Sequence, residues 1–323
     1  MSFFEGHNYR ELLFTKGVGN VLLTLRSGEP LEKVSGAFFN NLARLDSFCC
    51  FPAVVAAEAL QKQLWRDYAV FKVLGEPSLF TGPFDAKTES AIAREIGELE
   101  KAQHKQWMSG KDDRDVRRMT LGVGHIDEMV NEQLGAAQSM QAIFFSVIIE
   151  SWMAFETLAA DLWVVALDYG PAEWCTRVLL KYREFKKGSN FDPAVLPNVM
   201  PDPRKAFGSF LRDGEMVSLS KLRLIKFWYG TAFDGGTEIF KSNSYIQALA
   251  AVRNVIAHKA GMADEKYIKG VKSFPELNGI ALNALIHLDG EIVRKLSNAA
   301  ISLGHQLILF VDSGITPIPA KKT

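Results

Sequence analysis

The feature that most constrains the fold is a long apolar stretch from Met140 to Leu167. Its length and hydropathy would suit a helix that crosses a membrane, but Glu150, Glu156 and Asp161 interrupt it. Carboxylates are costly inside a bilayer, whereas the central helix of a soluble protein can place them at a groove or an interface. The stretch therefore predicts a buried core helix and no membrane anchor.

Helical periodicity dominates the rest of the chain, and the alternation typical of strands is scarce. The expected fold is therefore all-α. Pro52 disfavours helical geometry at Phe51 and could break the first helix there, and Tyr169-Gly170-Pro171 ends the core helix. The helices expected from the pattern cover about residues 31–74, 86–108, 126–168, 172–187, 219–229, 243–259 and 289–311.

A run of charged residues at 111–115 is the preferred domain boundary. It predicts an N-terminal helical region of unknown role at residues 1–115 and a second helical domain at residues 116–323. A continuous helical array without a linker is the alternative. Four prolines between residues 188 and 204 predict a loop inside the second domain, and the tail at 317–323 is expected to be disordered.

Composition sets limits on compartment and partners. Lys plus Arg (37) balance Asp plus Glu (37), so no global basic field drives nucleic-acid binding, and an RNA contact needs a local patch. The cysteines at 49, 50 and 175 form neither a disulfide framework nor a metal-ligand spacing. The N-terminus lacks the basic-then-apolar order of a signal peptide. We expect a cytoplasmic protein without a metal or another cofactor.

The sequence from Ala251 to Gly261 places three chemically active side chains on one apolar helix. At about 100° per residue, Asn254 and His258 are neighbours one turn apart, and Arg253 and His258 lie within an arc of about 140°. Arginine presents a planar fork of donors that suits phosphate, and histidine can give or take a proton near neutrality. One helix face could therefore show all three residues to a ligand. The alternative is that they only cap carbonyls at the helix end, which Gly261 marks.

This string resembles the motif of the HEPN superfamily (higher eukaryotes and prokaryotes nucleotide-binding domains), in which an Arg precedes a His by a short, variable gap. The gap here is four residues. Upstream, Phe144 to Asp168 is similar to the family's first long helix, and Trp152 to Leu158 stands in the place of its aromatic and acidic centre. Downstream, residues 261–268 are similar to the segment that follows the motif. The resemblance covers roughly residues 140–312.

The resemblance implies a helical bundle of HEPN type with an additional N-terminal helical region. It also implies a metal-independent endoribonuclease, a toxin or phage-defence effector, that works as a homodimer with two motif helices facing each other. The catalytic residues would be Arg253 on the phosphate, His258 on the proton, and Asn254 as an orienting group. Glu156 would fix Arg253, and Lys259 and Lys266 would extend the phosphate-binding patch. RNA or a nucleotide is then the expected ligand, with an antitoxin or regulatory partner.

Each assignment has a structural alternative. Asn254 could bond a neighbouring backbone carbonyl, Glu156 could be a structural ion-pair partner of Arg253, and Lys259 could be a solvated surface side chain. On this alternative the chain is a non-catalytic HEPN-like module that binds a nucleotide, RNA or a protein partner. Gly122-Val123-Gly124 lacks the third glycine of a dinucleotide-binding loop, and we set that interpretation aside.

Overall fold

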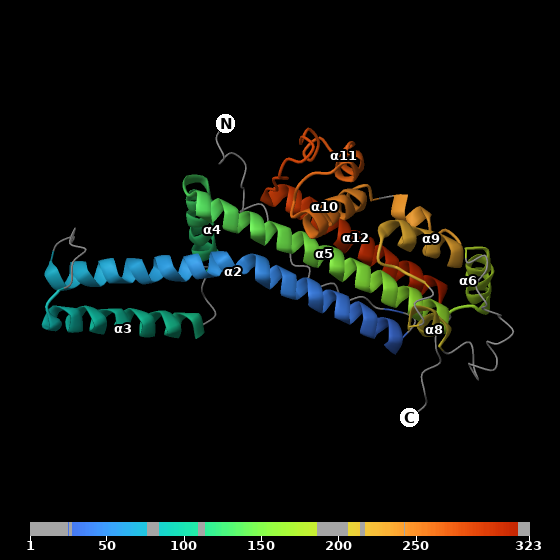
Figure 1. Cartoon of the computed structure of the whole chain (residues 1–323). Coiled ribbons are helices and arrows are strands. Elements are labelled where there is room, and N and C mark those ends of the chain that lie inside the picture. The colour runs from blue at the N-terminus through green and yellow to red at the C-terminus, as the bar shows by residue number, and fades with distance from the viewer. Residues whose placement is uncertain are drawn as a thin grey trace, which may run out of the picture. The chain divides into compact units, whose positions relative to one another are not determined.

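The described residues of this protein form an all-α structure, as predicted. A computed structural model describes residues 25, 28–75, 84–108, 114–185, 206–213, 217–241 and 243–315. Their regular elements are helices, with one isolated antiparallel bridge between Met262 and Leu285 (Figure 1). The predicted loop at 188–204 and the predicted tail at 317–323 lie outside the described residues.

The elements follow one another in the order labelled in Figure 1. They are α2 (Glu29–Leu74), α3 (Ala86–Met108), α4 (Arg114–Glu132), α5 (Leu134–Tyr169), α6 (Ala172–Phe185), α8 (Phe207–Asp213), α9 (Leu222–Ala232), the 3₁₀ helix η3 (Glu238–Lys241), α10 (Tyr245–Lys259), α11 (Glu265–Val271) and α12 (Gly290–Gly314).

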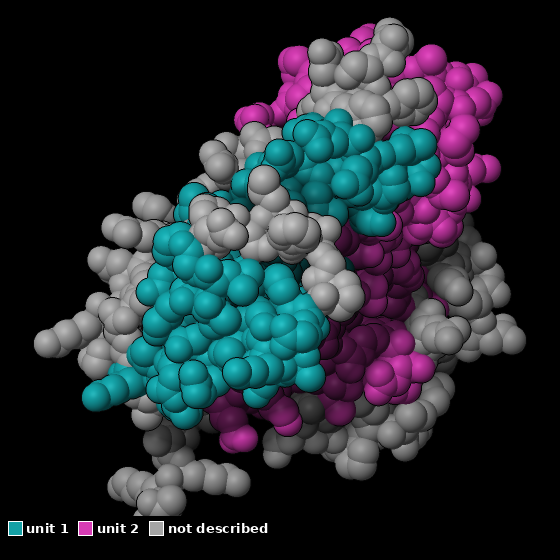
Figure 2. Space-filling model, turned by 90° about the vertical axis from the view of Figure 1, so that its left-hand side faces the viewer, with its two compact units in different colours: residues 1–13, 48–140 teal, residues 14–47, 141–323 magenta. Residues whose placement is uncertain are grey.

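The chain divides into two compact units, which Figure 2 draws in separate colours. Among the described residues, the first unit contains residues 48–140 and the second contains residues up to 47 together with those from 141 onward. The predicted boundary at residue 115 falls inside the first unit. Both α2 and α5 pass from one unit to the other, because neither helix ends where the units divide.

Several helix ends agree with local sequence signals. Helix α3 begins after Asp85, whose Oδ1 accepts hydrogen bonds from the backbone N–H groups of Lys87 and Thr88 at 2.9 and 3.0 Å. By contrast, α2 continues through Pro52 without the expected break. Cys49 and Ala53 are buried on either side of the proline, and such packing stabilises a helix against the loss of one hydrogen bond.

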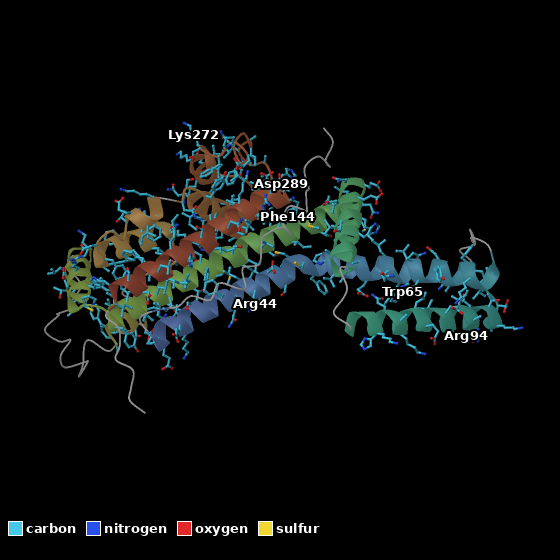
Figure 3. All side chains as sticks on the ribbon, turned by 180° about the vertical axis from the view of Figure 1, so that it is seen from behind. Arg44, Trp65, Arg94, Phe144, Lys272 and Asp289 are labelled. Atoms are coloured by element: carbon cyan, nitrogen blue, oxygen red, sulfur yellow. The ribbon has the colours of Figure 1, made fainter. Side chains whose placement is uncertain are left out.

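The predicted core helix is confirmed as the buried part of α5 in the second unit. Its largest fully buried side chains are Phe144, Trp152, Phe155 and Trp163, and Figure 3 shows the dense side chains around Phe144. By length and composition α5 could cross a membrane, but half of its most apolar window is buried inside the protein.

The three carboxylates that interrupt the apolar stretch each lie near an arginine of another helix. Glu150 faces Arg44 of α2 at 3.9 Å, Glu156 faces Arg253 of α10 at 4.0 Å, and Asp161 faces Arg212 of α8 at 2.6 Å between N and O. The acids that interrupt the apolar stretch therefore lie where α5 faces neighbouring helices, consistent with the interface positions expected for them.

Helix α12 runs alongside α5 in the second unit (Figure 1). The Ser151 hydroxyl donates to the Ser297 hydroxyl at 2.9 Å between buried residues, and further along both helices Gly304 adjoins Leu158. A Cβ on Gly304 would lie 2.9 Å from a Leu158 methyl carbon and 2.6 Å from the Phe38 ring of α2. The missing side chain thus allows α2, α5 and α12 to approach closely.

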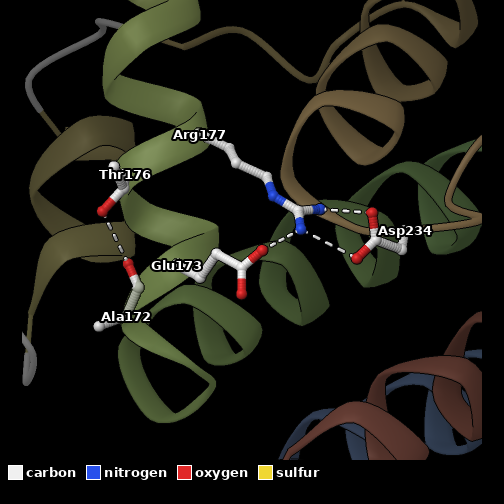
Figure 4. A network of polar contacts seen from close by, with 5 residues as sticks. All are labelled: Ala172, Glu173, Thr176, Arg177 and Asp234. Atoms are coloured by element: carbon white, nitrogen blue, oxygen red, sulfur yellow. Dashed lines mark hydrogen bonds and ion pairs between the residues drawn. The ribbon is translucent and has the colours of Figure 1, made fainter.

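Arg177 fastens α6 to the turn that follows α9 (Figure 4). Its two terminal nitrogens donate to both carboxylate oxygens of Asp234 at 2.6 and 2.9 Å, and Glu173 accepts a further bond from the same guanidinium. In the same region Asp168 accepts bonds from the N–H of Gly208 and the hydroxyl of Ser209, which joins α5 to α8. Burial raises the pKa of Asp168 despite these donors.

In the first unit, Gly122 has a packing role. A Cβ there would lie 2.3 Å from the Ala53 carbonyl oxygen and 2.9 Å from the Ala57 nitrogen, so glycine lets α4 lie directly on α2. A Cβ on Gly124, two residues later, would have no neighbouring atom within 4 Å. The glycine pair set aside as a nucleotide loop is therefore part of a helix, and its first member is required by a helix crossing.

Candidate functional site

The motif lies on α10, and its helix end agrees with the sequence. Leu249, Val252 and Val255 are buried and fix the apolar face of this helix. Ala260 caps it in the left-handed conformation at φ 49°, and Gly261 follows at φ 83°. The N–H of Gly261 donates to the carbonyl of Val255 at 3.1 Å. His258 is accordingly in the last turn, as predicted.

Arg253 faces α5. Its guanidinium lies 4.0 Å from a Glu156 oxygen, and both side chains are only 24% exposed. The guanidinium carbon is also 6.0 Å from the centre of the Trp152 ring, in the range of a cation–π contact. Its Nε is buried and has no hydrogen-bond partner among the described residues. Arg253 is therefore held between helices, and this pairing leaves one of its donors unused.

Glu156 is the centre of this buried cluster. It accepts a hydrogen bond from the indole N–H of Trp152 and pairs with Arg253. Burial raises the pKa of Glu156, and the Trp152 hydrogen bond and the Arg253 charge oppose that rise only in part. The carboxylate is thus a partly desolvated group whose ionised form depends on two neighbours.

His258 and Asn254 face a cavity on another side of α10. The cavity has a volume of about 530 Å³, and both side chains belong to exposed residues at its wall. Lys259 and Ala251 complete the contribution of α10. Binding sites for small ligands commonly measure about 300–1,000 Å³. The cavity can therefore hold a group larger than a single phosphate.

The other walls of the cavity come from α9 and α11. Lys221 precedes the first turn of α9, and Lys266 lies in the first turn of α11. Asp264 caps α11, because its Oδ1 accepts the N–H of Tyr267 at 2.8 Å. The Tyr267 side chain is 2% exposed and its hydroxyl donates to the Leu277 carbonyl. The walls are therefore rich in cations, with one carboxylate already engaged by backbone.

The predicted residues fall into two groups. Asn254, His258 and Lys259 line the cavity, whereas Arg253 and Glu156 form the neighbouring ion pair and do not line it. One hydrogen bond joins the groups, because an Arg253 terminal nitrogen donates to the Asn254 side-chain oxygen at 3.1 Å. The three motif side chains are thus connected but do not all face one ligand space.

Sequence reasoning missed Lys221 as a binding residue, whereas it did consider Lys266, together with Lys259, as an extension of the phosphate-binding patch. Lys221 is far from the motif in sequence, and an exposed lysine before a helix carries no signal of its own. Trp152 was recognised only as part of an aromatic helix centre. Its hydrogen bond to Glu156 follows from their spacing of four residues on α5, a signal that the sequence did contain.

Comparison with models of protein families, with curated proteins and with solved structures finds no match for this chain. Within the described part of the chain, no group of three or more His, Cys, Asp or Glu side chains is placed to hold a metal ion.

Proposed function

We propose that the protein is a metal-independent endoribonuclease of HEPN type, with its active site at the cavity beside α10. The observation that supports this most is the position of His258, which is exposed at the wall of a cavity that three lysines and Asn254 share. A proton-transfer group beside a cation-rich space is what cleavage of a phosphodiester requires.

The proposed reaction uses the nucleophile that RNA itself carries. A base removes the proton of the 2′-hydroxyl, and the 2′-oxygen attacks the adjacent phosphorus. The bond from phosphorus to the 5′-oxygen then breaks, and an acid delivers a proton to that oxygen. The products are a 2′,3′-cyclic phosphate and a 5′-hydroxyl, with no change in redox state. His258 moves one of the two protons, and Lys259 offsets the charge that develops on the phosphate.

Two proton transfers need two groups, and each chain offers one motif histidine. We propose that a homodimer brings a second α10 against the first, so that each cavity receives His258 of one protomer and its partner. This composite arrangement is the one that the HEPN resemblance implies, together with a bundle of HEPN type built around α5. A cytoplasmic toxin or phage-defence effector, restrained by an antitoxin or regulatory partner, is the corresponding biological role.

Arg253 has a supporting part in this proposal. It holds the Asn254 side chain by the 3.1 Å hydrogen bond and adds positive charge behind the cavity wall. Its pairing with Glu156, away from the cavity, favours a second candidate function. On that alternative the chain is a HEPN-like module that binds RNA or a nucleotide without cleaving it.

The test is cleavage of single-stranded RNA in EDTA by wild type, His258→Ala and Arg253→Ala, with analysis of the end groups. Wild type is expected to release cyclic phosphate and 5′-hydroxyl ends. Loss of a proton-transfer group typically lowers the rate about 10²–10⁴-fold, so His258→Ala should be nearly inactive. Arg253→Ala should lose activity together with stability.

His287→Ala is the matched control, since His287 is an exposed histidine of the same unit that does not line the cavity. It should cleave like wild type. A His258→Ala protein that cleaves as fast as His287→Ala would refute the mechanism. RNA binding by a wild-type protein that leaves the RNA intact would favour the non-catalytic module.

A further inference from the structure

The cavity beside α10 carries more positive charge than one scissile phosphate needs. Lys221, Lys259 and Lys266 line it, and Asp264 is its only acidic residue among those described. Three cations and one anion leave a formal charge of +2 before His258 is counted. A phosphodiester carries a single negative charge, so one bound phosphate would leave this charge only half neutralised.

The three lysines are free to bind a ligand. No described residue forms an ion pair with Lys221, Lys259 or Lys266, and all three are exposed. The contrast with Lys269 on the same α11 is direct, because that lysine faces Glu265 at 3.9 Å and does not line the cavity. The cavity lysines also come from three separate segments, before α9, at the end of α10 and in α11.

The remaining walls do not oppose an anion. Burial raises the pKa of Tyr267 to about 12, so its ring stays neutral at physiological pH. The Asp264 carboxylate accepts a hydrogen bond from the backbone N–H of Tyr267, so part of the carboxylate's charge is directed toward the start of α11. At about 530 Å³, the space exceeds what a lone phosphate would fill.

We propose that Lys221 and Lys266 form a subsite for a second phosphate of single-stranded RNA, next to the phosphate that His258 and Lys259 serve. This subsite rests on the proposed nuclease function for its biological meaning. Its role is to bind and position the strand, and Lys221 and Lys266 take no part in proton transfer. A substrate with two phosphodiesters then binds better than one with a single phosphodiester.

The probes are two oligonucleotides with 2′-O-methyl riboses, which cannot be cleaved by this chemistry: a dinucleotide with one phosphate and a trinucleotide with two. Binding is measured by calorimetry over a range of salt concentrations. Wild type should bind the trinucleotide roughly tenfold more tightly than the dinucleotide, since each neutralised phosphate releases counterions. In Lys221→Ala/Lys266→Ala this advantage should disappear. The salt slope for the trinucleotide should become shallower by about 0.7 for each phosphate that the variant no longer neutralises.

Lys269→Ala/Lys272→Ala is the matched control, because it removes the same charge from exposed lysines outside the cavity. It should keep the trinucleotide advantage. Neither cavity substitution removes a helix cap, since the Lys221 side chain makes no capping bond. Circular dichroism checks that both double variants fold.

Cleavage of the unmodified trinucleotide separates the two proposals. If wild type cleaves it and His258→Ala does not, but the cavity double variant keeps the trinucleotide advantage, the subsite is wrong and the nuclease stands. If wild type does not cleave it, but the advantage depends on Lys221 and Lys266, the nuclease is wrong and the subsite stands. Equal binding of both probes by wild type overturns the subsite.

Discussion

Helix α10 has one side that faces α5 and another that faces the cavity, and the two sides differ in the exposure and the partners of their side chains. On the side that faces α5, Arg253 is 24% exposed, ion-paired to Glu156 and close to the Trp152 ring. On the side of the cavity, Asn254 and His258 are exposed among lysines that pair with no described carboxylate. The first side packs against another helix, and the second is exposed at a cavity lined by lysines.

The difference shows that residues of one short motif can have different roles, one in stability and the other in chemistry. A residue that is held by packing contributes chiefly to stability, and its substitution disturbs the neighbours that it leaves behind. An exposed residue at a cavity contributes little to stability, and its substitution changes chemistry alone. The comparison can therefore be tested by measuring stability and activity of the same variants.

The largest effect is expected for Arg253→Ala. It leaves the Glu156 carboxylate partly buried without its cation and removes the contact with Trp152. We expect a loss of roughly 1–3 kcal/mol in the free energy of unfolding, against a change within about 0.5 kcal/mol for His258→Ala. Denaturant unfolding of both proteins measures the difference. Equal stability of the two variants would erase the distinction between the two sides.

A smaller loss of stability is expected for Gly261→Ala, at the point where α10 ends beside α5. Gly261→Ala places a side chain at φ 83°, and the new Cβ would lie 3.0 Å from the Phe145 ring. The left-handed conformation alone costs roughly 1–2 kcal/mol for a residue with a Cβ. Thermal unfolding should show this loss.

Gly270→Ala is the counterpart on the cavity side. Its Cβ would lie 2.8 Å from the Ala251 Cβ, so α11 must move away from α10 at the cavity wall. We expect this variant to alter RNA binding more than Gly261→Ala does, although it retains normal backbone geometry. If Gly261→Ala weakened RNA binding more than Gly270→Ala, the side of α10 that faces α5 would also determine the shape of the cavity.

The smallest effect is expected for the pH dependence of stability that the titration of Glu156 causes. Because burial raises its pKa in the folded state, the folded protein binds that proton more tightly than the unfolded chain. The resulting stabilisation is complete below the unfolded pKa and is lost as pH rises through the folded value. Glu156→Gln cannot titrate, so wild type should lose stability relative to this variant over the pH range that begins at the ordinary pKa of a glutamate, about 4.3, and extends upward. A constant difference across that range would contradict a desolvated carboxylate.

Much of the fold follows from local patterns. The start of α3 after Asp85, the core position of α5 and the end of α10 before Gly261 agree with capping and periodicity signals. Several boundaries differ from expectation, among them the start of α4 at Arg114, which the pattern placed near residue 126. Helix α2 continues through Pro52 because the residues on either side of the proline are buried. The long pattern that begins near residue 126 is interrupted at Gln133, between α4 and α5. Periodicity alone does not register such a short interruption.

The sequence by itself determined that α5 is a core helix, that Arg253, Asn254 and His258 share one helix, and that His258 lies in its last turn, because these properties depend on neighbouring residues. Only the tertiary structure decided that Arg253 faces Glu156 while His258 faces a cavity. It also decided that Lys221 joins Lys266 there. Such choices depend on which helices pack against α10, and contacts between segments far apart in the chain leave no trace in local periodicity.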